Sequence, residues 1–74
     1  METVKLYKLK KGEKFRTLDI HGEPETGILI KGRPHTDYYG NKLYVTFIYA
    51  PGEPYDHSFA GHMNCDIDVV RVTD

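Results

Sequence analysis

One segment, residues 43–50, constrains the fold of this chain more than any other. It reads Leu-Tyr-Val-Thr-Phe-Ile-Tyr-Ala, an unbroken run of apolar, aromatic or β-branched residues with turn-forming residues on both sides. Such side chains fit a pleated and packed surface, and a run of this length is typical of a strand covered on both faces. We therefore expect a central β-strand here, within an all-β domain.

Shorter segments of the same character predict further strands at residues 3–9, 14–20, 27–31, 55–59 and 67–72. Gly12 is expected to supply the positive φ of the first tight turn. Residues 32–41 predict a protruding hairpin loop, and residues 60–64 predict a loop or one helical turn. No segment keeps a helical spacing of apolar residues for long. The expected fold is all-β, a small antiparallel barrel of five to six strands with at most one short helical turn.

The core is predicted from the large apolar side chains of these strands. In residues 43–50 the alternation of a strand places Leu43 and its alternate neighbours inward, and Tyr44, Thr46 and Ile48 on the opposite face. The whole predicted core is Leu6, Phe15, Leu18, Ile20, Ile28, Ile30, Leu43, Val45, Phe47, Tyr49, Phe59, Ile67, Val69 and Val72.

Length and composition favour a single small β-barrel domain spanning residues 1–74. Cys65 is the only cysteine, so no internal disulfide is expected, and a reducing, cytoplasmic location is the simpler interpretation. The N-terminus lacks the long apolar region of a signal peptide, and no apolar stretch approaches the roughly 18 residues that span a bilayer. We expect no membrane association and no cofactor.

Four segments carry a resemblance. They are residues 9–16 (Leu-Lys-Lys-Gly-Glu-Lys-Phe-Arg), 27–30 (Gly-Ile-Leu-Ile), 44–47 (Tyr-Val-Thr-Phe) and 68–72 (Asp-Val-Val-Arg-Val). In order, they form a glycine turn into a strand, a glycine-led strand, an aromatic strand and a closing apolar strand. This order resembles the small SH3-like barrels of the Tudor and KOW kind. The resemblance implies a fold, and a binding module with exposed loops, but it transfers no functional residue.

Tyrosine is unusually frequent, with six in 74 residues and no tryptophan. Tyrosines that gather at a surface anchor protein interfaces, because the ring is apolar and the hydroxyl is polar. The leading hypothesis is a non-catalytic regulatory, adaptor or inhibitor protein, of the kind found among phage and mobile-element accessory proteins, that binds another protein. The residues expected to bind it are Tyr38, Tyr39, Tyr44, Tyr55, Arg33 and His35. The alternative for the tyrosines is that two or three of them finish the edge of the core.

The charges are distributed unevenly. Residues 1–33 hold eight Lys or Arg and five Asp or Glu, a net charge of +3, whereas residues 34–74 hold two and six, a net charge of −4. The alternative function is therefore nucleic-acid binding through an N-terminal basic strip, with phosphates bound by cations and bases stacked on a tyrosine. The strip is Lys5, Lys8, Lys10, Lys11, Lys14 and Arg16. The same strip is also expected of lysines that merely protect an edge strand.

Two further hypotheses use the histidines. His57, His62 and Cys65 form a weak candidate zinc set, although their spacing matches no strong zinc pattern. Catalysis by Cys65 with His62 lacks a third orienting group, so we expect no enzyme activity. A third function class is an oligomer that holds a nucleotide or a similar small anion between barrels.

Overall fold

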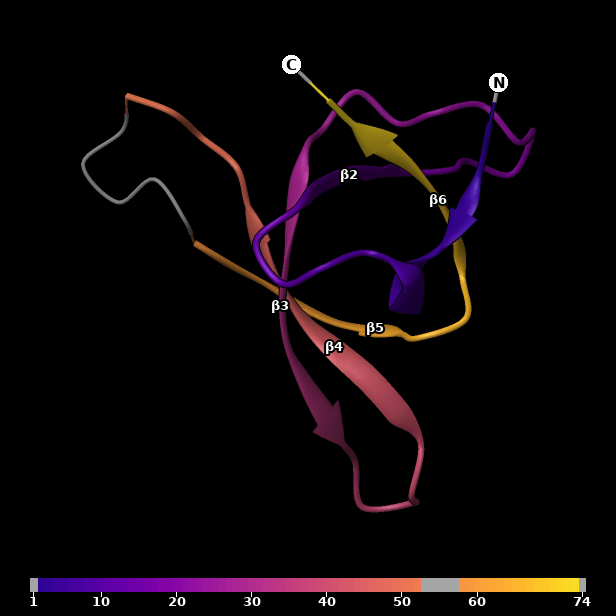
Figure 1. Ribbon diagram of the computed structural model, residues 1–74, viewed down its shortest axis with the longest axis vertical. Helices are drawn as coiled ribbons and strands as arrows, with labels where there is room; N and C mark the ends of the chain where they lie inside the picture. The colour runs from indigo at the N-terminus through magenta and orange to yellow at the C-terminus, as the bar shows by residue number, and fades with distance from the viewer. Residues whose placement is uncertain (1, 53–57, 74) are drawn as a thin grey trace.

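The computed structural model describes residues 2–52 and 58–73 and contains one six-stranded antiparallel sheet (Figure 1). The strands are β1 (Val4–Lys5), β2 (Lys14–Thr17), β3 (Leu29–Thr36), β4 (Lys42–Ile48), β5 (Phe59–Asn64) and β6 (Asp68–Val72), and one 3-10 turn, η1 (Leu6–Lys8), follows β1. The order across the sheet is β1-β6-β2-β3-β4-β5. The predicted fold class is confirmed, and the sheet is compatible with a small barrel. Within the described residues, no helix is long and apolar enough to cross a membrane.

β3 pairs with two neighbouring strands. Its first residues pair with β2 and its whole length pairs with β4, with a bulge between Lys31 and Pro34 that bends the strand. At the other end, η1 crosses to the turn that joins β5 to β6. There the Leu6 N–H donates to the Ile67 carbonyl at 3.0 Å, and the Tyr7 N–H donates to the Cys65 carbonyl at 2.9 Å. These bonds bring the N-terminal segment beside the end of β5.

Several predicted boundaries are wrong. The first half of the predicted loop 32–41 belongs to β3, so the turn of the β3–β4 hairpin is confined to residues 37–41. Residues 60–64 are strand rather than loop or helix, and residues 3–9 are strand only at Val4–Lys5. Residues 55–57 of the predicted strand 55–59 lie outside the described residues. The predicted positive φ of Gly12 is confirmed at 94°.

The core is smaller than predicted. Among the described residues, four apolar side chains are buried: Leu6, Phe15 and Val69 completely, and Leu9 with 3% exposure. Val4, Leu29, Tyr44, Met63 and Ile67 pack against them. Two predicted core residues are wrong, since Ile20 is 95% exposed and Phe59 is 58% exposed. The remaining predicted core residues, Leu18, Ile28, Ile30, Leu43, Val45, Phe47, Tyr49 and Val72, are half-buried.

The inward face of β4 is the opposite of the predicted one. Thr46 is fully buried and Tyr44 packs on the core, although both were expected on the outer face. Thr46 is tolerated inside because its hydroxyl donates to the Gly61 carbonyl at 2.9 Å, which removes the cost of burying an unpaired polar group. Val45 and Phe47 consequently face outward.

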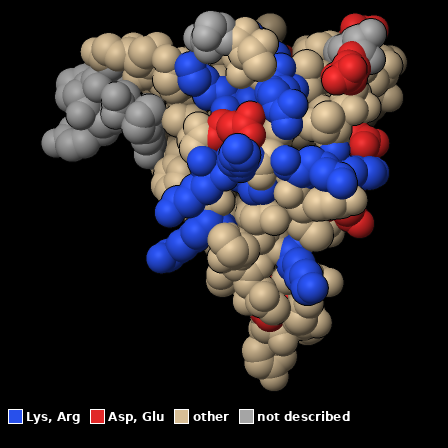
Figure 2. All heavy atoms as spheres, viewed as in Figure 1, with Lys and Arg blue, Asp and Glu red and all other residues tan. Residues whose placement is uncertain are grey.

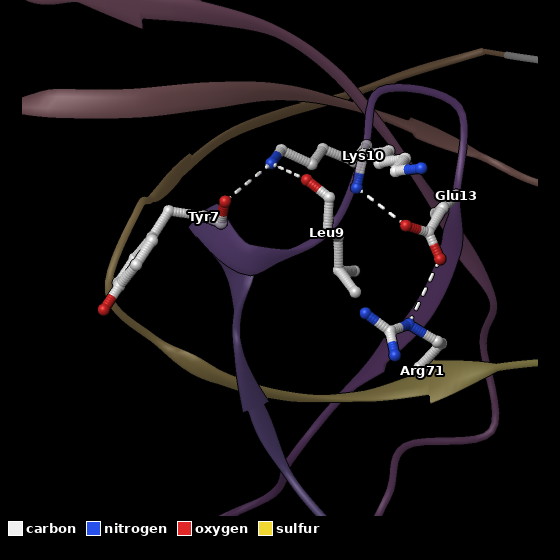
Figure 3. Close-up of polar contacts among 6 residues, drawn as sticks. Tyr7, Leu9, Lys10, Glu13 and Arg71 are labelled. Atoms are coloured by element: carbon white, nitrogen blue, oxygen red, sulfur yellow. Dashed lines mark hydrogen bonds and ion pairs between the residues drawn. The ribbon is translucent and has the colours of Figure 1, made fainter.

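Lys31 fills the interior beside Thr46, its partner across the β3–β4 pair. The residue is only 4% exposed, and its ammonium lies 3.9 Å from the centre of the Tyr44 ring. Its Nζ donates to the carbonyl oxygens of Tyr7, at 3.4 Å, and of Leu9. Figure 3 shows both carbonyls directed at this one amino group. Lys31 thus fastens η1 and the following segment to β3 and β4.

Glu13 holds the turn that follows this segment. One carboxylate oxygen accepts the Lys10 backbone N–H at 2.7 Å, and the other pairs with the Arg71 Nε of β6 at 3.1 Å (Figure 3). The turn is completed by the Glu13 N–H, which donates to the Lys10 carbonyl at 3.0 Å. The turn is therefore tied both to itself and to β6.

Gly32 is required by packing at the bend of β3. A Cβ at this position would lie 2.8 Å from both the Phe47 Cε2 and the Val45 carbonyl oxygen. Because a backbone carbonyl cannot move aside, we expect Gly32→Ala to lower the free energy of unfolding by about 1 to 3 kcal/mol. Gly27→Ala is the matched control, since a Cβ there meets nothing within 4 Å. Urea denaturation of both variants measures the difference, and equal stability of the two would contradict the packing argument.

Stability should also depend on the ionisation of Lys31. Burial lowers the pKa of its ammonium below the usual 10.5, although the Glu13 carboxylate opposes the shift. Between the lowered pKa and 10.5 the unfolded chain binds more protons than the folded one, so this group makes stability rise with pH in that window. The free energy of unfolding of wild type, measured by urea denaturation, should therefore rise relative to that of Lys31→Met as the pH is raised from 7 towards 10.5. A difference independent of pH would show that the ammonium is not desolvated.

Candidate functional site

The β3–β4 hairpin protrudes from the rest of the molecule, and its turn is built around Asp37 (Figure 1). One Asp37 carboxylate oxygen accepts the backbone N–H groups of Tyr39 and Asn41, at 2.9 and 2.8 Å. The other accepts the Asn41 side-chain amide at 3.0 Å. Gly40 completes the turn with a φ of 83°. The arrangement of a turn followed by a left-handed glycine is a common three-residue hairpin connection, and its own hydrogen bonds order it.

This turn presents Tyr38 and Tyr39 to solvent, 95% and 83% exposed. Their rings meet edge to face, with centroids 5.4 Å apart. Tyr44 of the predicted patch does not join them. Tyr44 packs inside the sheet under Lys31, and Tyr55 lies outside the described residues. We name residues 37–41 the hairpin tip.

His35 belongs to a different surface, on the outer face of β3, β4 and β5. Its ring stacks on that of His62, with centroids 4.3 Å apart. The ring centroids of His62 and Phe59 are 5.4 Å apart, and those of Phe59 and Phe47 are 6.4 Å apart. In both pairs the ring planes meet edge to face, at 70° and 74°. We name this set, His35, His62, Phe59 and Phe47, the aromatic row. Phe59 and His62 share a face although they are three positions apart, because the β4–β5 register shifts between Thr46 and Phe47.

A hollow of about 450 Å³ opens beside the aromatic row, and we name it the outer hollow. Its walls are Lys11 of the first turn, Gly32 and Arg33 of β3, Val45 and Phe47 of β4, and Phe59 and His62 of β5. Lys11, Arg33, Phe59 and His62 are all exposed, and none of the described residues in the wall is acidic. The outer hollow therefore combines aromatic rings with two cations. Sequence reasoning missed it because Phe47 and Phe59 have the character of core residues.

The predicted basic strip is divided by the fold. Lys8, Lys10 and Lys11 are exposed, whereas Lys5 pairs with Asp68 at 3.1 Å. Across the face viewed in Figure 2, Lys and Arg side chains form a band over the middle of the molecule, with a small acidic group inside it. Cations thus gather on this face, although the strip is not continuous.

Lys14 and Arg16 of β2 are half-buried and serve the fold. The Lys14 ammonium lies 4.4 Å from the centre of the Tyr49 ring. The Arg16 guanidinium donates to the carbonyls of Glu25, at 3.2 Å, and Thr26, and so holds the segment that leads into β3. These contacts occupy both cations within the molecule. Whether the strip binds nucleic acid stays a prediction.

The weak metal candidate rests on residues that the structure describes only in part. His57 lies outside the described residues, His62 is exposed in the aromatic row, and Cys65 is a half-buried free thiol. Across residues 2–52 and 58–73, no three His, Cys, Asp or Glu side chains gather as a metal site. A second hollow of about 400 Å³ is lined by residues of η1, of the β3–β4 hairpin and by Cys65, among them Tyr7, His35 and Tyr44.

Comparison with protein families, with curated proteins and with solved structures gives no match for this chain. The candidate surfaces are therefore the hairpin tip and the outer hollow, as their own geometry defines them. Both surfaces include residues of β3, β4 or their turn, but they share no residue, and the outer hollow also includes Lys11 of the first turn and Phe59 and His62 of β5.

The order of the hairpin tip can be tested through Asp37. The Asn41 side-chain amide is the main cause that lowers the pKa of this carboxyl below 3.8, and the backbone N–H groups of Asn41 and Tyr39 add to it. Asn41→Ala should therefore raise the Asp37 pKa towards 3.8, as measured by carboxyl-carbon NMR over pH 2 to 6. Because the folded pKa is depressed, the carboxylate stabilises the tip above pH 3.8, and this contribution is lost as the pH falls through the lowered pKa. An unchanged titration in the variant would contradict the assigned contacts.

Proposed function

We propose that this chain is a non-catalytic binding module that binds another protein through its hairpin tip. The observation that carries the proposal is the near-complete exposure of two adjacent tyrosines, Tyr38 and Tyr39, on a protruding turn. Large aromatic side chains are costly to leave in water unless a partner covers them, and tyrosine is enriched among the residues that dominate interface energies. The module is a small barrel of the SH3-like kind that acts as a regulator or adaptor.

The rigidity of the tip supports this role. Asp37 orders the turn before any partner arrives, so binding pays little of the entropy cost of ordering a loop. The two rings are also held edge to face, so both reach forward as one unit. A protruding pair of this kind fits a concave surface on a partner, where each ring is buried and each hydroxyl finds a polar atom.

The double variant Tyr38→Ala with Tyr39→Ala should abolish partner capture and leave folding unchanged. Each anchor of an interface is worth about 2 kcal/mol or more, so the affinity should fall at least about thirtyfold. The thermal midpoint should stay nearly constant, because the substituted side chains contact solvent. Affinity capture from the native host, identified by mass spectrometry with and without nuclease, measures the first effect, and circular dichroism the second.

Ile20→Ala provides the matched control, since Ile20 is also 95% exposed but belongs to a loop outside the hairpin. It should retain every partner. The proposal is wrong if the double variant captures the same proteins as wild type, or if Ile20→Ala loses them equally.

A further inference from the structure

We infer that the outer hollow is a second binding site, independent of the hairpin tip, and that it takes a segment of single-stranded nucleic acid. A base stacks on Phe59 and His62, and the neighbouring phosphates bind Lys11 and Arg33. None of these residues belongs to residues 37–41, so the inference stands or falls separately from the proposed protein interface.

The aromatic row supplies the surface for the base. Phe59 is 58% exposed although its ring lies between two others, Phe47 on one side and His62 on the other. Because Phe47 and His62 support it, the Phe59 ring is held in place without being covered. An exposed ring that neighbouring rings hold still is the feature on which bases stack in single-strand binding proteins, whatever the sequence of the strand.

The two cations give the hollow its charge preference. Lys11 and Arg33 line it from two sides, both are exposed, and neither makes an ion pair with any residue in the described part of the chain. No described wall residue carries a negative charge. A ligand that combines planar apolar groups with repeated negative charges complements this wall, and nucleic acid is that ligand.

Single strands fit better than duplexes, free nucleotides or acidic peptides. Bases of a duplex are stacked on each other, so the rings could not reach them. Small-molecule sites bury most of their ligand. The charged and aromatic side chains of this wall, Lys11, Arg33, Phe59 and His62, are instead exposed. A strand would extend past the hollow to Lys10, which is exposed and precedes Lys11 in the chain. An acidic peptide would pair with the cations but would offer no planar group to Phe59.

Fluorescence anisotropy with labelled oligothymidylate and oligouridylate strands, roughly ten nucleotides long, tests the inference on the full chain. Wild type should bind at about 50 mM salt and more weakly at about 200 mM. Phe59→Ala should weaken binding roughly five- to hundredfold, and its circular dichroism should match that of wild type because Phe59 lies outside the core. Tyr39→Ala, which truncates an exposed ring at the tip, should bind the strands like wild type.

Charge reversals separate a defined site from general attraction. A plot of log affinity against log salt has a negative slope. Lys11→Glu and Arg33→Glu should each make this slope shallower by about 0.7, the value for one lost phosphate contact on a single strand. Lys8→Glu makes the same change of charge outside the hollow and should have a smaller effect. The difference between Lys11→Glu and Lys8→Glu is the measurement that decides.

Four results would overturn the inference. They are no binding of wild type at about 50 mM salt, unchanged binding by Phe59→Ala, equal losses for Lys8→Glu and Lys11→Glu, and equal affinity for a duplex. Displacement of the strand by polyglutamate at equal charge, or by a free mononucleotide at equal concentration, would assign the hollow to an acidic protein or a metabolite and would also refute it.

Discussion

The buried ammonium of Lys31 decides which side of the β3–β4–β5 sheet is the interior. A cation inside a small domain needs partners close by, because burial without them is costly. Here the carbonyls of Tyr7 and Leu9 and the face of the Tyr44 ring provide them. These partners lie on η1 and the residue after it and on β4, so Lys31, which belongs to β3, holds three segments together. Thr46, which pairs with Lys31, and Tyr44, whose ring contacts the ammonium, therefore face the same interior.

The outward position of Val45 and Phe47 is a consequence of this choice. Side chains alternate along a strand, so once Thr46 points inward its neighbours must point out. Gly32 then lets the Phe47 ring lie directly on the backbone of β3, since a Cβ would collide with it. The bulge in β5 places Phe59 and His62 on that same outer face. An interior that accommodates polar groups thus leaves apolar and aromatic groups outside, where a ligand can use them.

The fold class could be predicted from the sequence because it depends on local patterns. The β-branched run at 43–50 and the left-handed Gly12 both carry their meaning within a few residues. The inward face of β4 could not be predicted in this way. Alternation alone favours Phe47 over Thr46 as the buried residue. The contacts that reverse this preference, of Lys31 with the Tyr7 and Leu9 carbonyls and of Thr46 with the Gly61 carbonyl, join segments that are distant in the sequence. The aromatic row was hidden for the same reason, since the register shifts that align it depend on the neighbouring strands. The exposed position of Tyr38 and Tyr39 was easier to expect, because both precede a glycine in a turn.

The two candidate surfaces share the β3–β4 hairpin, yet their supports differ. The tip is ordered by hydrogen bonds among Asp37, Tyr39 and Asn41, all within the turn. The outer hollow is ordered by ring packing across β3, β4 and β5 and by the close approach at Gly32. A ligand couples two sites only when it favours one of two arrangements that both sites sense. Because each surface is held by its own local contacts, occupation of one requires no rearrangement of the other. The hairpin is therefore suited to hold two ligands side by side, and their affinities should be independent.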